Sequence, residues 1–252
     1  MLDFTGRTVL VTGGTKGIGR VIAQTFLDAG ADVAVCGRTE PADGGFGHFL
    51  PADVRDAAAC QTLVRQTVER FGRLDVCVNN AGGSPDAAAA TVSTRFFDKI
   101  VALNLLAPFY VAQAANAVMQ GQPAGGTILN IGSVSARDPQ PGTAAYSAAK
   151  GGLLVLTRAL ALEWAPKVRV NHITAGLIRT EAAEANYNDQ TAALIPMGRM
   201  ATPTDVANAC AYLASDLAAY VTGADLAVDG GGEVPARYVV AQAGSHPPVS
   251  PR

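Results

Sequence analysis

Two kinds of hydrophobic pattern alternate along most of the chain, and each predicts a different element. The first is a short, almost continuously apolar run rich in β-branched residues, which is typical of a strand covered on both faces. The second is a longer stretch with helical periodicity. The expected strands are residues 8–12, 32–36, 48–51, 75–78, 126–131, 168–173 and 225–228. The expected helices are residues 17–29, 56–71, 96–119, 143–164 and 204–214.

The order of these elements predicts the fold class. Strands that alternate with helices form a parallel sheet with helices on both faces. We therefore expect an α/β fold of the Rossmann type, a doubly wound parallel sheet of about seven strands. The length of 252 residues suits one large domain better than two small ones, and we expect that domain to span residues 1–232. Pro166 is expected to end the helix before it.

The segment 233–252 differs in composition from the rest of the chain. After Gly232 it becomes polar and proline-bearing, and it ends in AGSHPPVSPR. We expect a C-terminal extension whose end has no fixed structure. Its central YVVAQA run could pack on a neighbouring subunit.

Composition and charge exclude several classes of protein. Contents of 49% apolar and 16% charged residues suit a compact core and not a disordered chain. A net charge of −2 without a basic run offers no electrostatic footprint for nucleic acid. The chain enters its first strand almost at once, so we expect no signal peptide. No apolar stretch is expected to reach the length of a membrane-spanning helix, because Arg158 and Glu163 interrupt LLVLTRALALEWA, and we expect a cytoplasmic protein.

The cysteines and histidines indicate neither a disulfide framework nor a metal site. The cysteines at positions 36, 60, 77 and 210 are widely spaced and form no CxxC pair, so reduced and mostly buried thiols are expected. The histidines at positions 48, 172 and 246 do not have the spacing of metal ligands. We expect a metal-free protein.

A glycine-rich loop follows the first expected strand directly. It reads TGGTKGIG, from Thr12 to Gly19, and the next helix begins inside it. Glycine tolerates positive φ and has no Cβ to keep a pyrophosphate away from the backbone. The N-terminus of the helix would direct free N–H groups and its positive dipole end at the phosphates. A structural turn uses the same residues, but the position between the first strand and the first helix favours dinucleotide binding.

The end of the second strand indicates which dinucleotide binds. A carboxylate there would hold the adenosine ribose 2′-hydroxyl and repel a 2′-phosphate. This chain has Arg38 instead, whose planar cationic group suits a phosphate, and Lys16 in the glycine loop could add a second cation. The alternative is that Arg38 is a solvated loop residue and that Glu40 holds the ribose. We favour NADP(H), with NAD(H) as the alternative.

Tyr146 and Lys150 lie four residues apart in an expected helix, which places them on the same face. An unperturbed tyrosine has a pKa near 10, and a neighbouring ammonium lowers it toward the range useful for acid–base catalysis. Ser133 follows an expected strand at the sheet edge where the glycine loop also lies, and its hydroxyl could bind a carbonyl oxygen. A hydride donor, this hydroxyl and the phenol together would make a carbonyl reduction site.

At these residues the chain resembles the classical short-chain dehydrogenases/reductases, and the resemblance extends from Phe4 to Gly231. Single motifs are weak signals, but the ordered set is specific. The matching positions are the TGxxxGxG loop, Asp53-Val54, Asn79-Asn80-Ala81-Gly82, Asn104, Ser133, Tyr146-x-x-x-Lys150 and Asn171 with Gly176-x-Ile178-x-Thr180.

The resemblance implies catalytic roles. Tyr146 would be the acid/base, Lys150 would bind the nicotinamide ribose and lower the tyrosine pKa, and Ser133 would orient the substrate. Asn104 would hold a water molecule in a proton relay. The residues implied to bind the cofactor, besides Tyr146 and Lys150, are Gly13, Thr15, Lys16, Gly17, Ile18, Gly19, Arg38, Asp53, Val54, Asn80, Ala81, Gly82, Gly176, Ile178 and Thr180.

Within the implied cofactor site, Asp53 and Val54 would contact the adenine, and Asn80 would stabilise the central sheet beside the cofactor. Ile178 and Thr180 would contact the nicotinamide carboxamide. Residues 181–197 would form a substrate lid, whose small and acidic composition contains no basic cluster to bind a phosphopantetheine. The resemblance also implies a homotetramer or homodimer, with the helices that contain Asn104 and Tyr146 at an interface.

One position departs from the family pattern, which commonly has Pro-Gly where this chain has Ala175-Gly176. Because Gly176 is kept, we expect a slightly looser loop and an intact nicotinamide face. Plainer interpretations remain open at three places. Asn104 could be a buried, satisfied helix asparagine, Asn79 and Asn80 could be turn residues, and Thr180 could be a helix cap.

The sequence thus favours an NADP(H)-dependent oxidoreductase that interconverts a ketone and a secondary alcohol, similar to 3-oxoacyl-thioester reductases. The alternative is an NAD(H)-dependent dehydrogenase of a steroid, a sugar or another secondary alcohol, because the fold alone does not choose the substrate. A third hypothesis is a nucleotide-sensing binding protein without turnover, but such a protein would be expected to lack the serine, tyrosine or lysine.

Overall fold

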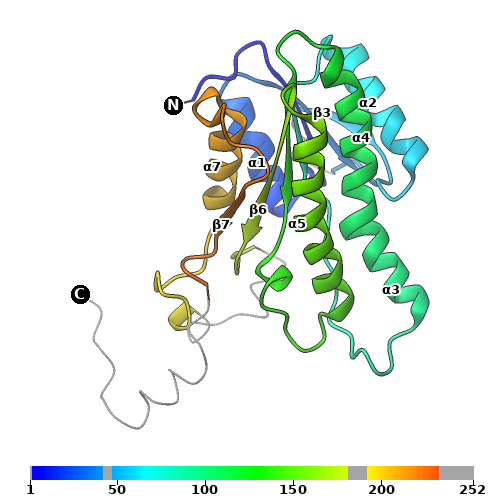
Figure 1. The fold of residues 1–252 in the computed structure, drawn as a ribbon, viewed down its shortest axis with the longest axis vertical. Helices are drawn as coiled ribbons and strands as arrows, with labels where there is room; N and C mark the ends of the chain where they lie inside the picture. The colour runs from blue at the N-terminus through cyan, green and yellow to red at the C-terminus, as the bar shows by residue number, and fades with distance from the viewer. Residues whose placement is uncertain (1, 42–46, 181–191, 233–252) are drawn as a thin grey trace.

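The computed structural model describes residues 2–41, 47–180 and 192–232, which form three layers (Figure 1). A parallel sheet of seven strands lies between two layers of helices, in the order β3-β2-β1-β4-β5-β6-β7. The order changes direction between β1 and β4, which is the switch point where ligands bind in such sheets. The doubly wound α/β prediction is confirmed. The expected extension at 233–252 and most of the expected lid lie outside the described residues.

The strands have the expected positions to within two residues. Because both faces of the sheet are covered by helices, the strands are apolar along nearly their whole length. Their bounds are β1 Thr8–Thr12, β2 Asp32–Gly37, β3 His48–Pro51, β4 Val76–Asn79, β5 Gly126–Ile131, β6 Val168–Ala175 and β7 Asp225–Val228.

The helices also follow the expected pattern, and local signals fix several ends. Asp56 caps α2 by accepting from the N–H groups of Ala58 and Ala59, and Gly72 ends it in the left-handed region. Thr202 and Asp205 form a capping box at the start of α7. The bounds are α1 Gly17–Asp28, α2 Ala57–Phe71, α3 Thr94–Val101, α4 Ala107–Gly121, α5 Ala144–Trp164 and α7 Pro203–Ala214, with short turns η2 Val134–Ala136 and η4 Asp216–Ala218.

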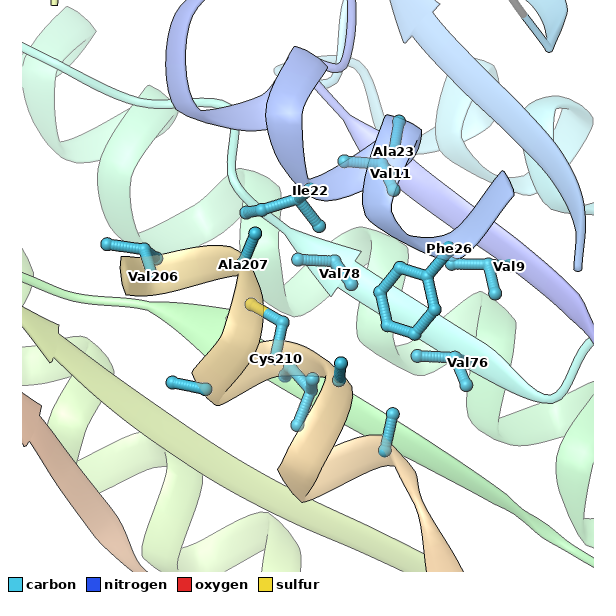
Figure 2. Packing of buried hydrophobic residues seen from close by; sticks show 14 of the residues in the cluster. Val9, Val11, Ile22, Ala23, Phe26, Val76, Val78, Val206, Ala207 and Cys210 are labelled. Carbon is cyan, nitrogen blue, oxygen red and sulfur yellow. The ribbon is translucent and has the colours of Figure 1, made fainter. Parts of the chain in front are cut away.

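One hydrophobic cluster joins α1 and α7 to one face of the sheet (Figure 2). The second cluster joins α2, α4 and α5 to the other face. In the first cluster, aliphatic side chains of β1 and β4 face the two helices. Its labelled members are Val9, Val11, Ile22, Ala23, Phe26, Val76, Val78, Val206, Ala207 and Cys210. These contacts fix the strand ends from which the site residues project.

The four cysteines are free and buried, as expected. Burial raises the pKa of the Cys36 thiol to about 11 and that of Cys60 to about 12. Thiols with such pKa values are poor nucleophiles at neutral pH, so these cysteines are core residues.

The expected helix 96–119 differs from the structure at its centre. Residues Ala102–Leu106 form a π-helical segment, η1, between α3 and α4, and Asn104 lies within it. The sequence carried a signal for this interruption. Pro108 has no N–H group to donate to the carbonyl of Asn104, four residues earlier, so a regular α-helix cannot be complete there.

The expectation that no apolar stretch reaches membrane-spanning length was wrong. Within the described residues, the continuous helical run from Thr94 to Gly121 is long and apolar enough to cross a membrane, judged by length and composition alone. However, its α4 part packs on the sheet within the second cluster. Core helices of soluble proteins can have the same length and apolar composition. The run therefore does not indicate a membrane protein.

Candidate active site

The candidate site lies along the carboxyl ends of β1, β4 and β5. These strands end at Thr12, Asn79 and Ile131, and their parallel register brings the ends to one edge of the sheet. The glycine loop, the Asn80–Gly83 loop and the Ser133 turn follow directly. The glycine loop and Ser133 were expected at this edge, and the topology brings them there together with the Asn80–Gly83 loop.

The glycine loop has the conformations and the close contacts that require glycine. Gly13 and Gly17 have φ values of 63° and 54°, in the left-handed region. A Cβ on Gly19 would lie 2.4 Å from the Gly13 oxygen and 2.3 Å from the Asn80 amide nitrogen. The loop is therefore folded tightly at the N-terminus of α1, and its backbone carries no side chains at these positions.

Asn80 holds the glycine loop in place. Its Nδ2 group donates to the Thr12 oxygen at 3.0 Å and to the Gly13 oxygen at 3.2 Å. The backbone N–H groups of Asn80 and Ala81 both donate to Thr12 Oγ1, at 3.0 and 3.1 Å. Asn80 thus binds β1 and the loop together, which is more than a turn residue alone would do.

Asn79 supports the adjacent strands. Its Nδ2 group donates to the Asn130 side chain on β5 at 2.9 Å and to the Pro108 oxygen on α4 at 3.1 Å. Asn130 in turn donates to Thr157 on α5 at 2.9 Å. This buried chain of hydrogen bonds links β4, β5 and two helices beneath the site.

Arg38 lies at the end of β2, next to the glycine loop. A Cβ on its neighbour Gly37 would come within 3.1 Å of the Thr15 side chain, so the two loops touch. The Arg38 side chain is exposed, as is Glu40. Arg38 is close enough to Asp53 for its charge to affect that carboxyl group.

Asp53 and Val54 follow β3 at the same edge. The Arg55 guanidinium donates to Asp53, with Nε 2.9 Å from Oδ1. The hydrogen bond from Arg55 is the main cause that lowers the pKa of Asp53 to about 2, and the charges of Arg55 and Arg38 add to it against the opposing effect of burial. Val54 is buried in the second hydrophobic cluster. One side of this candidate adenine site is therefore apolar and the other is charged.

Tyr146 and Lys150 project from the same face of α5, as the spacing predicted. The Lys150 ammonium is 5.7 Å from the centroid of the Tyr146 ring and donates to the Ile131 oxygen at 2.7 Å. The lysine is only 3% exposed, and this burial lowers its pKa to about 8. Lys150 thus connects the tyrosine to the end of β5, two residues before Ser133.

Ser133 is the N-cap of the short turn η2, which packs against α5. Its Oγ accepts a hydrogen bond from the Ser135 N–H at 3.2 Å. That bond occupies one lone pair of the oxygen, so the hydroxyl hydrogen is left to donate to another group. The hydroxyl is half-buried beside the helix that carries Tyr146.

Asn104 is completely buried and its side chain is bonded to the protein. Oδ1 accepts from Gly83 N at 2.9 Å, while Nδ2 donates to the oxygens of Gly83 and Ile100, both at 3.0 Å. Gly82 lies between Asn104 and the lysine, because a Cβ there would be 2.8 Å from Asn104 Oδ1 and 3.3 Å from Lys150 Nζ. The asparagine therefore supports the loop beside Lys150, and both its amide hydrogens are used.

The residues after β6 lie at the same edge. A Cβ on Gly176 would be 2.7 Å from Asp229 Cα, so this position requires glycine although the preceding residue is Ala175. Ile178 is buried and forms a parallel bridge with Ala201. Thr180 is half-buried and precedes residues 181–191, which lie outside the described part of the chain.

The described residues also contain a polar cluster that the sequence pattern did not predict. His172 on β6 contacts Asp225 on β7, and both lie beneath the Ser133 turn. Their separation of 53 residues gave no local signal. Within residues 2–41, 47–180 and 192–232, no group of three or more His, Cys, Asp and Glu side chains could hold a metal ion.

Comparisons with known proteins identify the family of the chain. A family model described as enoyl-(acyl carrier protein) reductase matches residues 13–233. The chain is 37% identical to glucose 1-dehydrogenase 2 of Bacillus subtilis (strain 168), over 91% of this chain and 95% of that protein. It is 35% identical to the 3-oxoacyl-(acyl-carrier-protein) reductase of Escherichia coli (strain K12), over 91% of this chain and 98% of that protein.

A solved structure agrees as well. The short-chain dehydrogenase/reductase from Serratia marcescens BCRC 10948 has a TM-score of 0.84 and 34% sequence identity, and the match covers 91% of this chain and 98% of that one. Sequence, site geometry and fold all lead to the same assignment. The chain belongs to the classical short-chain dehydrogenase/reductase family and is an NAD(P)-dependent oxidoreductase.

Proposed function

We propose that the chain is an NADP(H)-dependent oxidoreductase that interconverts a ketone and a secondary alcohol at a site formed by Ser133, Tyr146 and Lys150. The observation that carries the proposal is the position of Lys150. Its buried ammonium lies 5.7 Å from the Tyr146 ring centroid and is fixed to the strand end that leads into the Ser133 turn. A cation held beside a phenol at a nucleotide-binding edge suits proton transfer to a carbonyl oxygen.

Each of the three side chains has a distinct task in this proposal. The Ser133 hydroxyl donates a hydrogen bond to the substrate carbonyl and holds its oxygen beside Tyr146. The Tyr146 phenol gives its proton to that oxygen during reduction and takes it back during oxidation. The Lys150 ammonium stabilises the phenolate that remains after proton transfer. When bound, the reduced nicotinamide supplies the hydride that reaches the carbonyl carbon.

Asn104 supports a path for the proton that returns to Tyr146. Its side-chain amide hydrogens are donated to the oxygens of Gly83 and Ile100. A water molecule would therefore bind to the backbone carbonyl of Asn104 instead. That carbonyl lacks its regular helical donor because residue 108 is proline. We propose that the π-helical segment presents the carbonyl toward Lys150, and that the buried asparagine side chain holds the segment there.

The glycine loop suits the pyrophosphate of the cofactor. Gly13 and Gly17 have left-handed backbones, and the contacts of Gly19 leave no room for a side chain. The backbone can therefore approach a ligand at the N-terminus of α1, where anions are favoured. The other proposed cofactor contacts are Thr15, Lys16, Ile18, Asp53, Val54, Asn80, Ala81, Gly82, Gly176, Ile178 and Thr180.

Arg38 supports the preference for NADP(H). Its exposed guanidinium lies at the end of β2, where the glycine loop touches Gly37, and it could pair with a 2′-phosphate. Lys16, exposed at the start of α1, could provide a second positive charge. Glu40, also exposed, is the residue that would instead favour NAD(H) by binding the ribose.

The substrate class is proposed from similarity. The bacterial 3-oxoacyl-(acyl-carrier-protein) reductase supports a 3-oxoacyl thioester or a related ketone as substrate. The name of the Bacillus subtilis relative, a glucose dehydrogenase, supports a second candidate, the oxidation of a sugar or another secondary alcohol. In this candidate NAD(H) is the alternative cofactor. The segment that would distinguish them, 181–197, lies mostly outside the described residues.

The proposed activity can be tested with purified native chain and Tyr146→Phe. Turnover of a panel of ketones and alcohols is followed by the nicotinamide absorbance, with each cofactor. We expect NADPH-dependent reduction by the native chain and a loss of about 10²-fold or more in kcat for the variant. Equal activity of the two proteins would show that Tyr146 is not the acid/base. Tight NADPH binding without turnover of any substrate would favour a nucleotide-sensing protein.

We also propose a cytoplasmic homotetramer or homodimer. Large apolar side chains are exposed on the helices that contain or adjoin the site, with Val155 at 64% and Leu162 at 85% on α5, and Phe97 at 38% on α3. An exposed apolar stripe on a soluble protein commonly marks an interface. The domain would span residues 1–232, with the extension 233–252 beyond it.

A further inference from the structure

A cluster of polar side chains lies buried beneath the Ser133 turn and has no role in the proposed chemistry. His172 on β6 is completely buried, and its Nδ1 is 2.8 Å from Oδ1 of Asp225 on β7. Thr174 donates to the same oxygen at 2.7 Å. The guanidinium of Arg137 forms an ion pair with the other oxygen, Oδ2. Both oxygens of this carboxylate, whose side chain is 4% exposed, are therefore bound.

The charge of Asp225 determines which nitrogen of His172 carries a hydrogen. Burial raises the pKa of Asp225, but the hydrogen bonds from His172 and Thr174 and the positive charge of Arg137 oppose it, so the pKa is about 2. Asp225 is therefore ionised at neutral pH and can only accept hydrogen bonds. It follows that Nδ1 of His172 carries a hydrogen and donates it, which fixes the orientation of the ring.

The Cε1–Nε2 edge of the histidine ring lies against the backbone of Gly132. A Cβ on Gly132 would be 2.0 Å from Cε1 and 2.1 Å from Nε2 of His172. Nε2 is buried and has no hydrogen-bond partner within the described residues. Gly132 also donates its N–H to the Ile173 oxygen at 2.8 Å. The residue before Ser133 is thus fixed on β6 by one hydrogen bond and one close ring contact.

Arg137 lies at the other end of the same turn. Ser133 is the N-cap of η2. Arg137 follows its last residue and donates its backbone N–H to the Val134 oxygen. The Arg137 side chain then reaches β7 to pair with Asp225. One carboxylate therefore anchors both ends of the turn, at Gly132 through the His172 ring and at Arg137 directly.

We propose that His172, Asp225 and Arg137 are positioning residues that set the place of the Ser133 hydroxyl. None of the three touches the reacting atoms in this assignment, and each acts through the turn. The inference rests on the proposed function, because it requires that Ser133 orients the carbonyl. A misplacement of about 1 Å in such a group can lower the rate by about 10²-fold, so a rigid anchor has a direct effect on kcat.

The test is a double-mutant cycle between Arg137→Gln and Ser133→Ala. Arg137 is the better site for substitution, because its side chain is 44% exposed and the chain should still fold. In the native background, Arg137→Gln should lower kcat by about tenfold, while the dissociation constant for NADPH changes less than about twofold. In the S133A background, the same substitution should lower the residual kcat by less than about twofold. Arg137→Lys, which keeps the charge, should recover most of the lost activity.

A matched control is the Arg73–Asp75 ion pair, whose arginine side chain is 45% exposed and whose aspartate side chain is 10% exposed. Asp75 lies at the amino end of β4, on the sheet edge opposite Ser133. Arg73→Gln should affect stability to a similar degree as Arg137→Gln. It should leave kcat unchanged in both backgrounds, which separates loss of positioning from general loss of stability.

A second measurement is independent of activity. Hydrogen exchange of the backbone amides in residues 132–137 should become faster in Arg137→Gln and stay unchanged in Arg73→Gln. An equal loss of kcat in both serine backgrounds, no loss in the native background, or unchanged exchange in the turn would each overturn the inference. If Ser133→Ala alone left kcat and KM unchanged, the proposed role of the serine would itself be wrong, and that result is recognised without the Arg137 variant.

Discussion

The ammonium of Lys150 donates to the backbone oxygen of Ile131, 2.7 Å away, and so connects α5 to the end of β5. A buried lysine is destabilising unless it is bonded, because transfer of a charge from water to the protein interior is unfavourable. This bond satisfies one of its donors and directs the ammonium toward the tyrosine. The contact therefore relates the position of the proposed acid/base to the strand that carries Ser133.

The buried lysine predicts a pH dependence of activity. Burial lowers the pKa of Lys150 from 10.5 to about 8, so the ammonium is present below pH 8 and is lost as the pH rises through that value. We expect kcat/KM for carbonyl reduction to fall as the pH increases through about 8. The measurement is a pH profile with NADPH at saturation. Lys150→Met should have a low residual activity without this falling limb, and an unchanged limb in the variant would contradict the assignment.

The burial of Lys150 also predicts that the residue lowers the stability of the fold while it supports activity. Because its folded-state pKa is lowered, the unfolded chain binds more protons between pH 8 and 10.5, so the free energy of unfolding should rise with pH across that window. Lys150→Met removes the buried charge and keeps an apolar stem. We expect its Tm at pH 7 to equal or exceed that of the native chain while activity is lost. A large decrease in Tm would show that the hydrogen bond to Ile131 outweighs the desolvation of the charge.

Gly19 is predicted to be irreplaceable in the glycine loop. A Cβ there would lie 2.3 Å from the Asn80 amide nitrogen and 2.4 Å from the Gly13 oxygen, so the loop must move. We expect Gly19→Ala to lower the free energy of unfolding by about 1–3 kcal/mol and to weaken NADPH binding by at least about tenfold. The measurements are chemical denaturation and titration with NADPH.

Gly121 at the end of α4 provides the control, because nothing lies within 4 Å of a Cβ placed there. Gly121→Ala should leave NADPH binding unchanged and raise stability by up to about 1 kcal/mol. Weaker NADPH binding in both variants would mean that the effect at Gly19 is not local to the loop.

Arg38 is predicted to determine the cofactor preference. A charged hydrogen bond contributes about 1.5–3 kcal/mol, which corresponds to about 10- to 150-fold in kcat/KM. Arg38→Gln should therefore lower kcat/KM for NADPH by that factor and change the value for NADH by less than about threefold. Arg65→Gln, on the exposed face of α2, is a control and should change neither value. Equal or better use of NADH by the native chain would contradict the NADP(H) preference.

The sequence predicted the strands because burial on both faces leaves an apolar run that is visible locally, as in β1 and β4. It also predicted the pairing of Tyr146 with Lys150, since four residues on a helix share a face. It did not predict the contact of His172 with Gly132, because that contact joins neighbouring strands whose order depends on the whole topology. The π-helical segment was missed because the apolar pattern continues through it, although Pro108 marked the interruption.

Leu162 is predicted to lie in the subunit interface. It is 85% exposed on α5, and Val155 lies two helical turns earlier on the same face at 64%. A charge placed among apolar side chains that become buried on association would disfavour the oligomer. We expect Leu162→Glu to produce a smaller species by size-exclusion chromatography with light scattering, while its circular dichroism spectrum stays unchanged. Leu217→Glu, at a leucine 74% exposed on η4, is the matched control and should leave the mass unchanged. Dissociation by the η4 variant alone would place the interface on the opposite helical layer.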